Sequence, residues 1–174
     1  GDDVTNKLRV ANALDKSNAQ LQDLVDNTSD LIKLVSLEGK FLFVNRVWRE
    51  RLGYDLEDLA TLQLKDILWP EAADATLQLL KRIQEGEQVP DFETVFWDKQ
   101  HKKIYLTGSV TCRYENGKPT AFRCILHDAT SRVRAERSQS LYYSIANWMI
   151  KTQDLDEFYE RVHEELGKVI DAKN

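Results

Sequence analysis

Four side chains in this chain carry nitrogen or sulfur atoms of the kind that bind zinc. They are His101, His127, Cys112 and Cys124. The sequence has no Cys-x-x-Cys pair, and His101 lies in the polar loop 99–103. The other three fall on expected β-strands, whose register spreads them apart. The pattern therefore favours solvated or hydrogen-bonded side chains, and we expect no metal site.

A catalytic function is not indicated either. The pair His163-Glu164 invites comparison with the phosphoacceptor box of histidine kinases, in which an acidic residue, a basic residue and a proline follow the histidine. Residues 165–167 (Glu-Leu-Gly) break that pattern, so we interpret His163 as an ordinary helical residue. A Gly-rich phosphate loop and a Ser-His-Asp elbow are also missing from the sequence. We expect that this fragment is not an enzyme.

The most informative segment is 127–137, where a buried strand passes into a highly charged helix. Residues 120–126 are apolar and β-prone, whereas the residues after Thr130 fit only a solvated helix. Asp128 and Thr130 have short oxygen-bearing side chains, which can accept a hydrogen bond from a free amide at a helix start. Because such a junction can pass on force, we predict that Asp128 and Thr130 relay a signal into the helix.

Composition narrows the possible partners. The 174 residues have a formal charge of −5, and basic and acidic residues are interspersed, so a direct nucleic-acid partner is not expected. No run of about 18 apolar residues exists, so we expect no direct membrane contact. We therefore expect a soluble piece, and its start at Gly1 rather than Met indicates an excised one.

The two cysteines flank a hairpin signal at 115–117, in which Gly117 supplies a positive φ. A three-residue loop pairs Tyr114 with Lys118 and brings apolar residues to one face. The opposed pairs are then Val110 with Phe122, Gly108 with Cys124, and Leu106 with Leu126. In this register Cys112 lies about 13 Å along the strand from the residue opposite Cys124, which is too far for a disulfide. With a two-residue loop the two thiols would lie on opposite faces of the sheet. We therefore expect free thiols, consistent with a reducing cytoplasm.

Hydrophobic periodicity predicts a mixed order of strands and helices. The expected elements are a helix at 4–25, strands at 31–37 and 41–44, a helix at 46–52, short pieces at 55–60 and 64–69, a longer helix at 70–85, strands at 92–97, 104–114 and 120–127, and helices at 131–151 and 154–172. The longer helix is expected to bury Leu77, Leu80 and Ile83. In the first hairpin, one face would carry Ile32, Leu34 and Phe43.

The N-terminal helix has apolar residues at heptad spacing, and two interpretations of them remain open. One position is occupied by Val4, Ala11, Asn18 and Val25, the other by Lys7, Leu14 and Leu21. The helix forms a parallel coiled coil with Asn18 as its polar register residue, or it folds onto its own domain. In the C-terminal region Leu141, Ile145 and Trp148 have the same spacing. We expect a homodimer through these helices.

Residues 27–130 resemble a PAS domain throughout. Asp30-Leu31-Ile32 and Glu38-Gly39-Lys40-Phe41-Leu42-Phe43-Val44-Asn45 look like the family's opening hairpin, and Gly53-Tyr54 resembles the step that follows it. Asp128-Ala129-Thr130 is similar to the closing Asp-Ile-Thr (PAC-type) motif, with Ala129 in place of Ile. The resemblance implies an α+β fold: a five-stranded antiparallel sheet with short helices on one face, flanked by N- and C-terminal helices. It also implies that Asn45, Asp128 and Thr130 couple the sheet to an output helix.

Beyond Thr130 the chain resembles the linker and first helices of a GAF domain, as found in bacterial sensor histidine kinases. The residues that carry this resemblance are 141–146 and 154–159, and the GAF sheet itself would start after Asn174. The expected organisation is a helix at 1–27, a PAS domain at 28–130, and a linker helix with a truncated GAF start at 131–174. The partners expected from this are downstream GAF and kinase domains of the same chain.

A ligand, if one binds, is expected between the inner sheet face and the short helices; otherwise the same residues fill a dry core. The candidate pocket residues are Ile32, Leu34, Phe43, Trp48, Leu80, Leu106, Gly108, Val110, Phe122, Cys124 and Leu126. Haem-binding relatives use a histidine on the long helix, and flavin-adduct relatives use a cysteine on an early helix. This chain has neither, so we expect no cofactor. Flavin bound without a covalent link, stacked on Trp48, Trp69 and Trp97, is the alternative to a core role for these aromatic residues.

These features predict a cytoplasmic PAS sensory or relay module of a two-component histidine kinase. The alternatives are a dimerisation scaffold without a ligand, or a PAS module of a diguanylate cyclase or a transcriptional regulator.

Overall fold

The structure is a computed structural model that describes residues 1–151 and 155–173. The elements are α1 (Asp2–Asp26), β1 (Leu31–Ser36), β2 (Phe41–Val44), α2 (Arg46–Leu52), α3 (Leu56–Leu59), α4 (Leu64–Ile67), α5 (Pro70–Gln84), β3 (Phe92–Trp97), β4 (Lys103–Glu115), β5 (Lys118–Asp128), α6 (Thr130–Lys151) and α7 (Leu155–Lys173). This order confirms the expected α+β class, and the strand bounds differ from the prediction by at most two residues.

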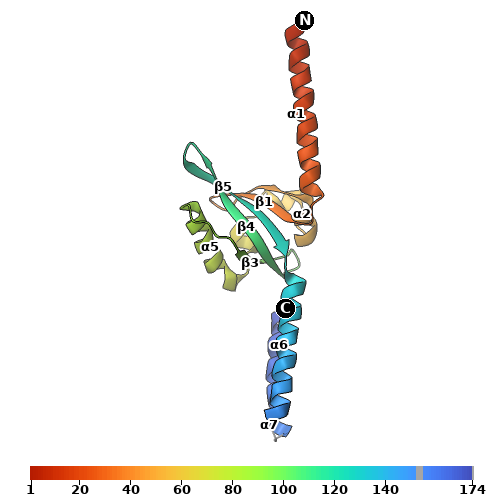
Figure 1. Cartoon of the computed structure of the whole chain (residues 1–174), viewed down its shortest axis with the longest axis vertical. Helices are drawn as coiled ribbons and strands as arrows, with labels where there is room; N and C mark the ends of the chain where they lie inside the picture. Colours follow the sequence, from red (N-terminus) through yellow and green to blue (C-terminus); the bar gives the residue numbers. More distant parts are fainter. Residues whose placement is uncertain (152–154, 174) are drawn as a thin grey trace.

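The five strands form one antiparallel sheet in the order β2-β1-β5-β4-β3. Helices α2 to α5 cover one face of this sheet, and the core lies between them (Figure 1). Its largest fully buried side chains include Trp48 and Phe96. Burying a side chain of this size stabilises the fold by about 1.5–3 kcal/mol. Leu31 at the start of β1 pairs with Leu126 near the end of β5. The chain therefore enters and leaves the sheet at the same end of two neighbouring strands.

Local sequence signals account for the two best-defined helix starts and stops. Asn45 caps α2, and Gly53 ends it with φ +80°, a conformation that glycine adopts without a steric penalty. Pro70 occupies the first turn of α5, where its missing N–H costs nothing. The predicted inner stripe of α5 is wrong at one position, because Leu77 is 46% exposed while Thr76 is buried.

The predicted inner face of the first hairpin is also wrong. Leu31, Lys33 and Val35 point into the core, whereas Ile32 and Leu34 are only partly buried. Phe43 pairs with Leu34 and lies with it on the outer face. The error has a physical cause. The inward face of β1 carries Leu31, Lys33 and Val35, and because it includes a lysine, the other face, with Ile32 and Leu34, appears to be the more apolar one in the sequence.

The β4–β5 hairpin has a tighter turn than predicted. Glu115 pairs with Lys118 across a two-residue loop, in which Asn116 and Gly117 both have positive φ. A register shift next to Arg113 then inserts one extra residue in β5.

The true partners are therefore two residues away from the expected ones: Val110 faces Cys124, and Gly108 faces Leu126. Because the shift is two residues, the apolar face is preserved. Cys112 faces Phe122 and lies on the same face as Cys124, and both thiols are free.

The flanking helices extend in opposite directions along the long axis of the molecule (Figure 1). Helix α1 buries none of its residues, so the alternative in which it folds back on the domain is wrong for this structure. Helices α6 and α7 lie side by side as an antiparallel pair. The side chain of Trp148 faces Arg161 of α7, so α7 covers part of the expected α6 seam. No helix in the described part of the chain is apolar over enough residues to span a membrane.

Candidate functional site

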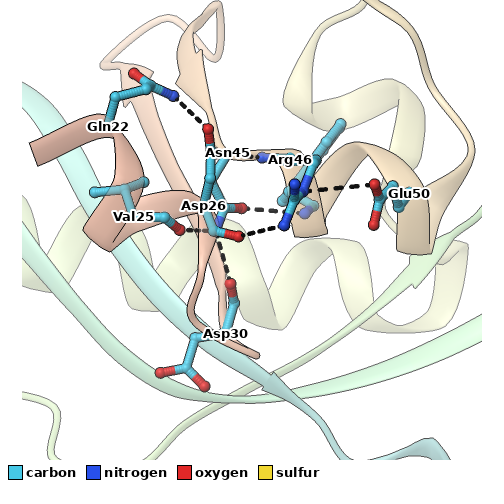
Figure 2. Close-up of polar contacts among 8 residues, drawn as sticks. Gln22, Val25, Asp26, Asp30, Asn45, Arg46 and Glu50 are labelled. Carbon is cyan, nitrogen blue, oxygen red and sulfur yellow. Dashed lines mark hydrogen bonds and ion pairs between the residues drawn. The ribbon is translucent and has the colours of Figure 1, made fainter. Parts of the chain in front are cut away.

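The first candidate site is the junction between α1 and the sheet, where Asn45 is fully buried (Figure 2). Its side-chain oxygen accepts hydrogen bonds of 3.0 Å from the backbone N–H of Ile32 and of Trp48. Its amide nitrogen donates to the carbonyl oxygens of Val25, at 2.9 Å, and Asp30, at 2.8 Å. One neutral side chain therefore joins the end of α1, the start of β1 and the start of α2.

A second set of contacts attaches α1 to α2 at the same junction (Figure 2). The Asp26 carboxylate accepts a 2.9 Å hydrogen bond from the Arg46 backbone N–H, and the Arg46 guanidinium donates to the Asp26 carbonyl oxygen at 3.0 Å. Gln22 donates to the other carboxylate oxygen of Asp26 at 2.8 Å. These hydrogen bonds from Gln22 and Arg46 hold the pKa of Asp26 below its ordinary value. The end of α1 is therefore joined to the first turn of α2 through both the backbone and the side chain of Arg46.

The second candidate site is the junction between β5 and α6. One oxygen of Asp128 accepts from the Thr130 N–H at 2.9 Å and from the Thr130 hydroxyl at 2.5 Å, and the other pairs with the Arg51 guanidinium. The Thr130 hydroxyl oxygen in turn accepts from the Tyr105 N–H at 3.1 Å. Ala129 is buried, and its N–H donates to the Tyr105 carbonyl. The first turn of α6 is thus attached to both β4 and α2.

Electrostatics at this junction favour a charged Asp128. Burial alone raises the pKa of Asp128, but the hydrogen bonds from Thr130 and the ion pair with Arg51 outweigh it, so the pKa lies below its ordinary value. The side chains of Asp128 and Arg51 remain 25% and 37% exposed. The junction therefore depends on charge in a place that solvent ions reach.

Two bridges connect the junctions with each other. Helix α2 is the first, since Arg46 in its first turn contacts Asp26 and Arg51 in its last turn pairs with Asp128. The second is Asp30, whose carbonyl binds Asn45 while its carboxylate lies 2.6 Å from Nδ1 of His127. Sequence analysis singled out Asn45 and Asp128 for this role and considered His127 only as a possible metal ligand. It missed Arg46, Arg51 and Asp30 as bridges, because their contacts join segments that are far apart in the sequence.

The predicted pocket residues are only partly brought together. Leu80, Phe122 and Cys124 line a small internal cavity between the sheet and the short helices. The other members of the predicted set lie elsewhere: Trp48, Leu106, Val110 and Leu126 are buried away from the cavity, Gly108 packs its backbone against Ile125, and Ile32, Leu34 and Phe43 are on the outer face.

A buried lysine lies beside this cavity, and the sequence analysis did not single it out. Lys33 is 3% exposed, and its ammonium lies 4.2 Å from the ring centroid of Phe96. Burial lowers the pKa of Lys33 to about 8. Its position opposite Cys124 in an apolar strand pair was a possible sequence signal, because a lysine is rarely enclosed without a partner.

Within the described residues, no group of three or more His, Cys, Asp or Glu side chains is arranged to hold a metal ion. His101 packs edge-on against Trp97, with ring centroids 5.3 Å apart. His127 is the partner of Asp30. Both histidines that the sequence offered as ligands thus have other contacts.

Two curated relatives match this chain over most of its length. The probable diguanylate cyclase DgcE of Escherichia coli (strain K12) is 23% identical over 126 residues, which cover 71% of this chain and 11% of that protein. The methyl sulfide methyltransferase-associated sensor of Methanosarcina acetivorans is 27% identical over 150 residues, which cover 85% of this chain and 15% of that protein. The chain therefore spans a small part of the curated relatives it matches.

Solved structures match the fold. A sensory box histidine kinase/response regulator from Burkholderia thailandensis has a TM-score of 0.57 at 16% identity, covering 74% of this chain and 98% of that chain. The PAS domain of a protein from Colwellia psychrerythraea has a TM-score of 0.57 at 17% identity, and the match covers 65% of this chain and 97% of that chain. A family model described as PAS fold matches residues 25–134. With this match over the sheet, its helices and both junctions, the chain belongs to the PAS family.

Proposed function

We propose that this PAS sensory domain forms a dimer and relays a signal between its two flanking helices, from α1 or the core into α6 and on to an output domain. The observation that carries the proposal is the pair of bridged junctions. Asn45 ties α1 to the start of β1, Asp128 ties α6 to the end of β5, and α2 contacts both. A change at one helix exit is thereby transmitted over a few residues to the other.

The output that we propose is a histidine kinase in the cytoplasm, with a GAF domain following α7. Solved PAS domains of sensor histidine kinases share the fold. A diguanylate cyclase is the second candidate, because a probable diguanylate cyclase is among the relatives. A scaffold that dimerises without passing on a signal is the third.

Dimerisation is proposed through α1. Val4, Leu14 and Leu21 occupy the two heptad positions and are 63%, 57% and 56% exposed. A second copy of α1 is the occupant that this spacing fits, since two such helices bury the seam in a parallel coiled coil. The expected seam on α6 contributes less, because α7 packs beside it.

Light scattering tests the dimer directly. We expect a mass of twice 20.2 kDa for the chain, and 20.2 kDa after the double change Leu14→Lys and Leu21→Lys. Gln20→Lys adds a charge outside the seam and is the matched control, which should remain dimeric. A monomeric wild-type chain at high micromolar concentration would contradict the proposal.

A chimaera tests the relay. Residues 1–174 are placed before the catalytic core of a histidine kinase, and autophosphorylation is measured. We expect Asp128→Ala and Thr130→Ala to change the basal rate several-fold. Losing a helix cap costs about 1 kcal/mol, and this energy changes the equilibrium constant of a balanced two-state system several-fold. Unchanged rates in both variants, with normal folding, would favour the scaffold.

A further inference from the structure

A lysine enclosed in the core is the feature of this domain that its fold does not require. Lys33 stands in the middle of β1, directly opposite Val44 on one side and Cys124 on the other. Its ammonium lies 4.2 Å from the centroid of the Phe96 ring and 5.9 Å from that of Phe41, and it makes no hydrogen bond or ion pair with any part of the chain that the structure describes. Buried charges are normally paired, because removing a charge from water is costly. Aromatic rings are thus the partners that the described residues give this charge, and no anion lies beside it.

The ammonium group faces a cavity that is apolar except for one hydroxyl. The cavity has a volume of about 10 Å³, which is room for about one water molecule. Its lining is Lys33, Val35, Leu64, Thr76, Leu80, Phe92, Phe96, Phe122 and Cys124. The Thr76 hydroxyl lies 2.8 Å from that of Thr94. No carboxylate is among these residues, so the chain itself supplies no counter-ion here.

A surface groove lies next to this cavity. The groove has a volume of about 240 Å³ and runs between the β1–β2 turn and α5. It shares three lining residues with the cavity: Leu64, Leu80 and Phe122. Movement of these side chains would join the two spaces and open a path to Lys33. Lys65, Lys81 and Glu38 are the charged residues of the groove lining, and their net charge of +1 favours the approach of an anion.

We propose that Lys33 binds the carboxylate of a small aliphatic monocarboxylic acid, whose alkyl chain occupies the space that Leu64, Leu80 and Phe122 vacate. One ammonium group matches one negative charge, and the apolar walls match a hydrocarbon chain. The limited space selects a short chain. This inference deepens the proposed sensory function, on which it depends for the role of the acid as a signal.

The binding should depend on pH in a defined way. Cys124 of β5 is the other titratable residue of the lining, and the residues from α4, α5 and β3 are uncharged. Burial raises the pKa of Cys124, so its thiol stays neutral below pH 8. A carboxylic acid is ionised above roughly pH 5. Lys33 loses its charge as the pH rises through about 8. Affinity should therefore be greatest between these limits and fall above pH 8.

Calorimetric and thermal titration of the whole chain with sodium butyrate at pH 6.5 tests the proposal. Butyramide, which has the same shape without the charge, should bind at least about ten-fold more weakly, and sodium chloride at equal ionic strength should have no specific effect. Lys33→Met should abolish butyrate binding and stay folded by circular dichroism, because replacing a buried unpaired charge by an apolar side chain is not costly. Lys118→Met, at the exposed hairpin tip, is the control that should bind normally.

Three results would overturn the proposal: equal binding of butyrate and butyramide, unchanged binding in Lys33→Met, or no binding across the acids from acetate to hexanoate. Its failure is distinguishable from failure of the sensory function. Binding without any change in the chimaera's kinase activity leaves the site standing and contradicts the sensory role. If Asp128→Ala or Thr130→Ala changes the kinase activity of the chimaera while no acid binds, the sensory role is supported and the acid site is contradicted.

Discussion

The two helix junctions of this domain are held together by different chemistry. At the α1 junction a buried neutral amide, Asn45, makes four hydrogen bonds to backbone groups. At the α6 junction a partly exposed carboxylate, Asp128, is held by a hydroxyl, an amide and a guanidinium. Salt and pH act strongly on exposed charges and weakly on buried neutral groups. The contacts of Asn45 at the α1 junction are therefore expected to respond weakly to salt and pH, and those of Asp128 at the α6 junction strongly.

The largest effect is expected from Asn45→Ala. Two N–H groups and two carbonyl groups lose their partner when this fully buried side chain is removed, at about 1–3 kcal/mol for each group that stays unsatisfied. We expect a loss of about 3 kcal/mol or more in the free energy of unfolding, with the melting temperature lowered by about 10 °C or more. Urea denaturation followed by circular dichroism measures the change.

Two further variants show whether hydrogen bonding is the cause. Asn45→Asp keeps the acceptor for Ile32 and Trp48 but turns a carboxylate oxygen towards two carbonyl oxygens, so it should also destabilise the fold at neutral pH. Asn147→Ala, on an exposed part of α6, should change stability by less than about 0.5 kcal/mol. A mild effect of both Asn45 variants would mean that the hydrogen bonds of Asn45 contribute little to the stability of the α1 junction.

Asp128→Ala should have a smaller effect, about 1 kcal/mol, which is typical of a lost helix cap. The ion pair with Arg51 adds little, because both side chains are partly exposed. Asp128→Asn, which keeps an acceptor for Thr130, should cost less than Asp128→Ala. Denaturation midpoints measure these differences, and Glu136→Gln, in an exposed ion pair of α6, is the control. If Asp128→Ala equalled Asn45→Ala in cost, the contrast between the two junctions would be wrong.

Acid should separate the junctions without any mutation. Because the pKa of folded Asp128 is below its ordinary value, its stabilising contribution is complete above about pH 4 and is lost as the pH falls through the folded pKa. Asn45 does not titrate, and the carboxylate at the α1 junction, Asp26, bonds to Gln22 and Arg46 rather than to the Ile32 and Trp48 N–H groups. Amide exchange measured from pH 6 to pH 3 should therefore show the Thr130 N–H losing protection before the Ile32 and Trp48 N–H groups. Simultaneous loss at all three would show that acid unfolds the domain as one unit.

Sequence reasoning found the elements of both junctions but only one side of their contacts. Asn45, Asp128 and Thr130 stand at element boundaries, where short polar side chains have a recognisable capping role. Their partners Val25, Arg51 and Tyr105 have no such local signature, because the fold brings them together from distant parts of the chain.

Register was the second limit of the sequence. The hairpin signal at Asn116 and Gly117 correctly placed a turn, but the extra residue near Arg113 has no signal in the hydrophobic pattern, which a shift of two residues leaves intact. Lys33 misled the assignment of faces for the opposite reason. A charge inside the core contradicts the alternation rule, and such a local contradiction is typical of a functional position.

The smallest expected effect is the coupling between the junctions through α2. Arg46→Gln loosens the α1 contact and Arg51→Gln the α6 contact. The Val133 N–H, which donates to the Ala129 carbonyl in the first turn of α6, reports on the α6 junction. If α2 transmits strain, Arg46→Gln should change the exchange rate of Val133 about two-fold, and the two changes together should depart from additivity by about 0.4 kcal/mol.

Arg113→Gln, in an ion pair on the β4–β5 hairpin, should leave Val133 unaffected. If the effects of Arg46→Gln and Arg51→Gln on Val133 are strictly additive, the connection would instead run through Asp30 and His127, whose contact is the other link between the two junctions. His127→Gln would then be the variant that separates α1 from α6. Helix α2 and the Asp30 link thus make opposite predictions for the same amide, and a single exchange measurement on Val133 distinguishes them.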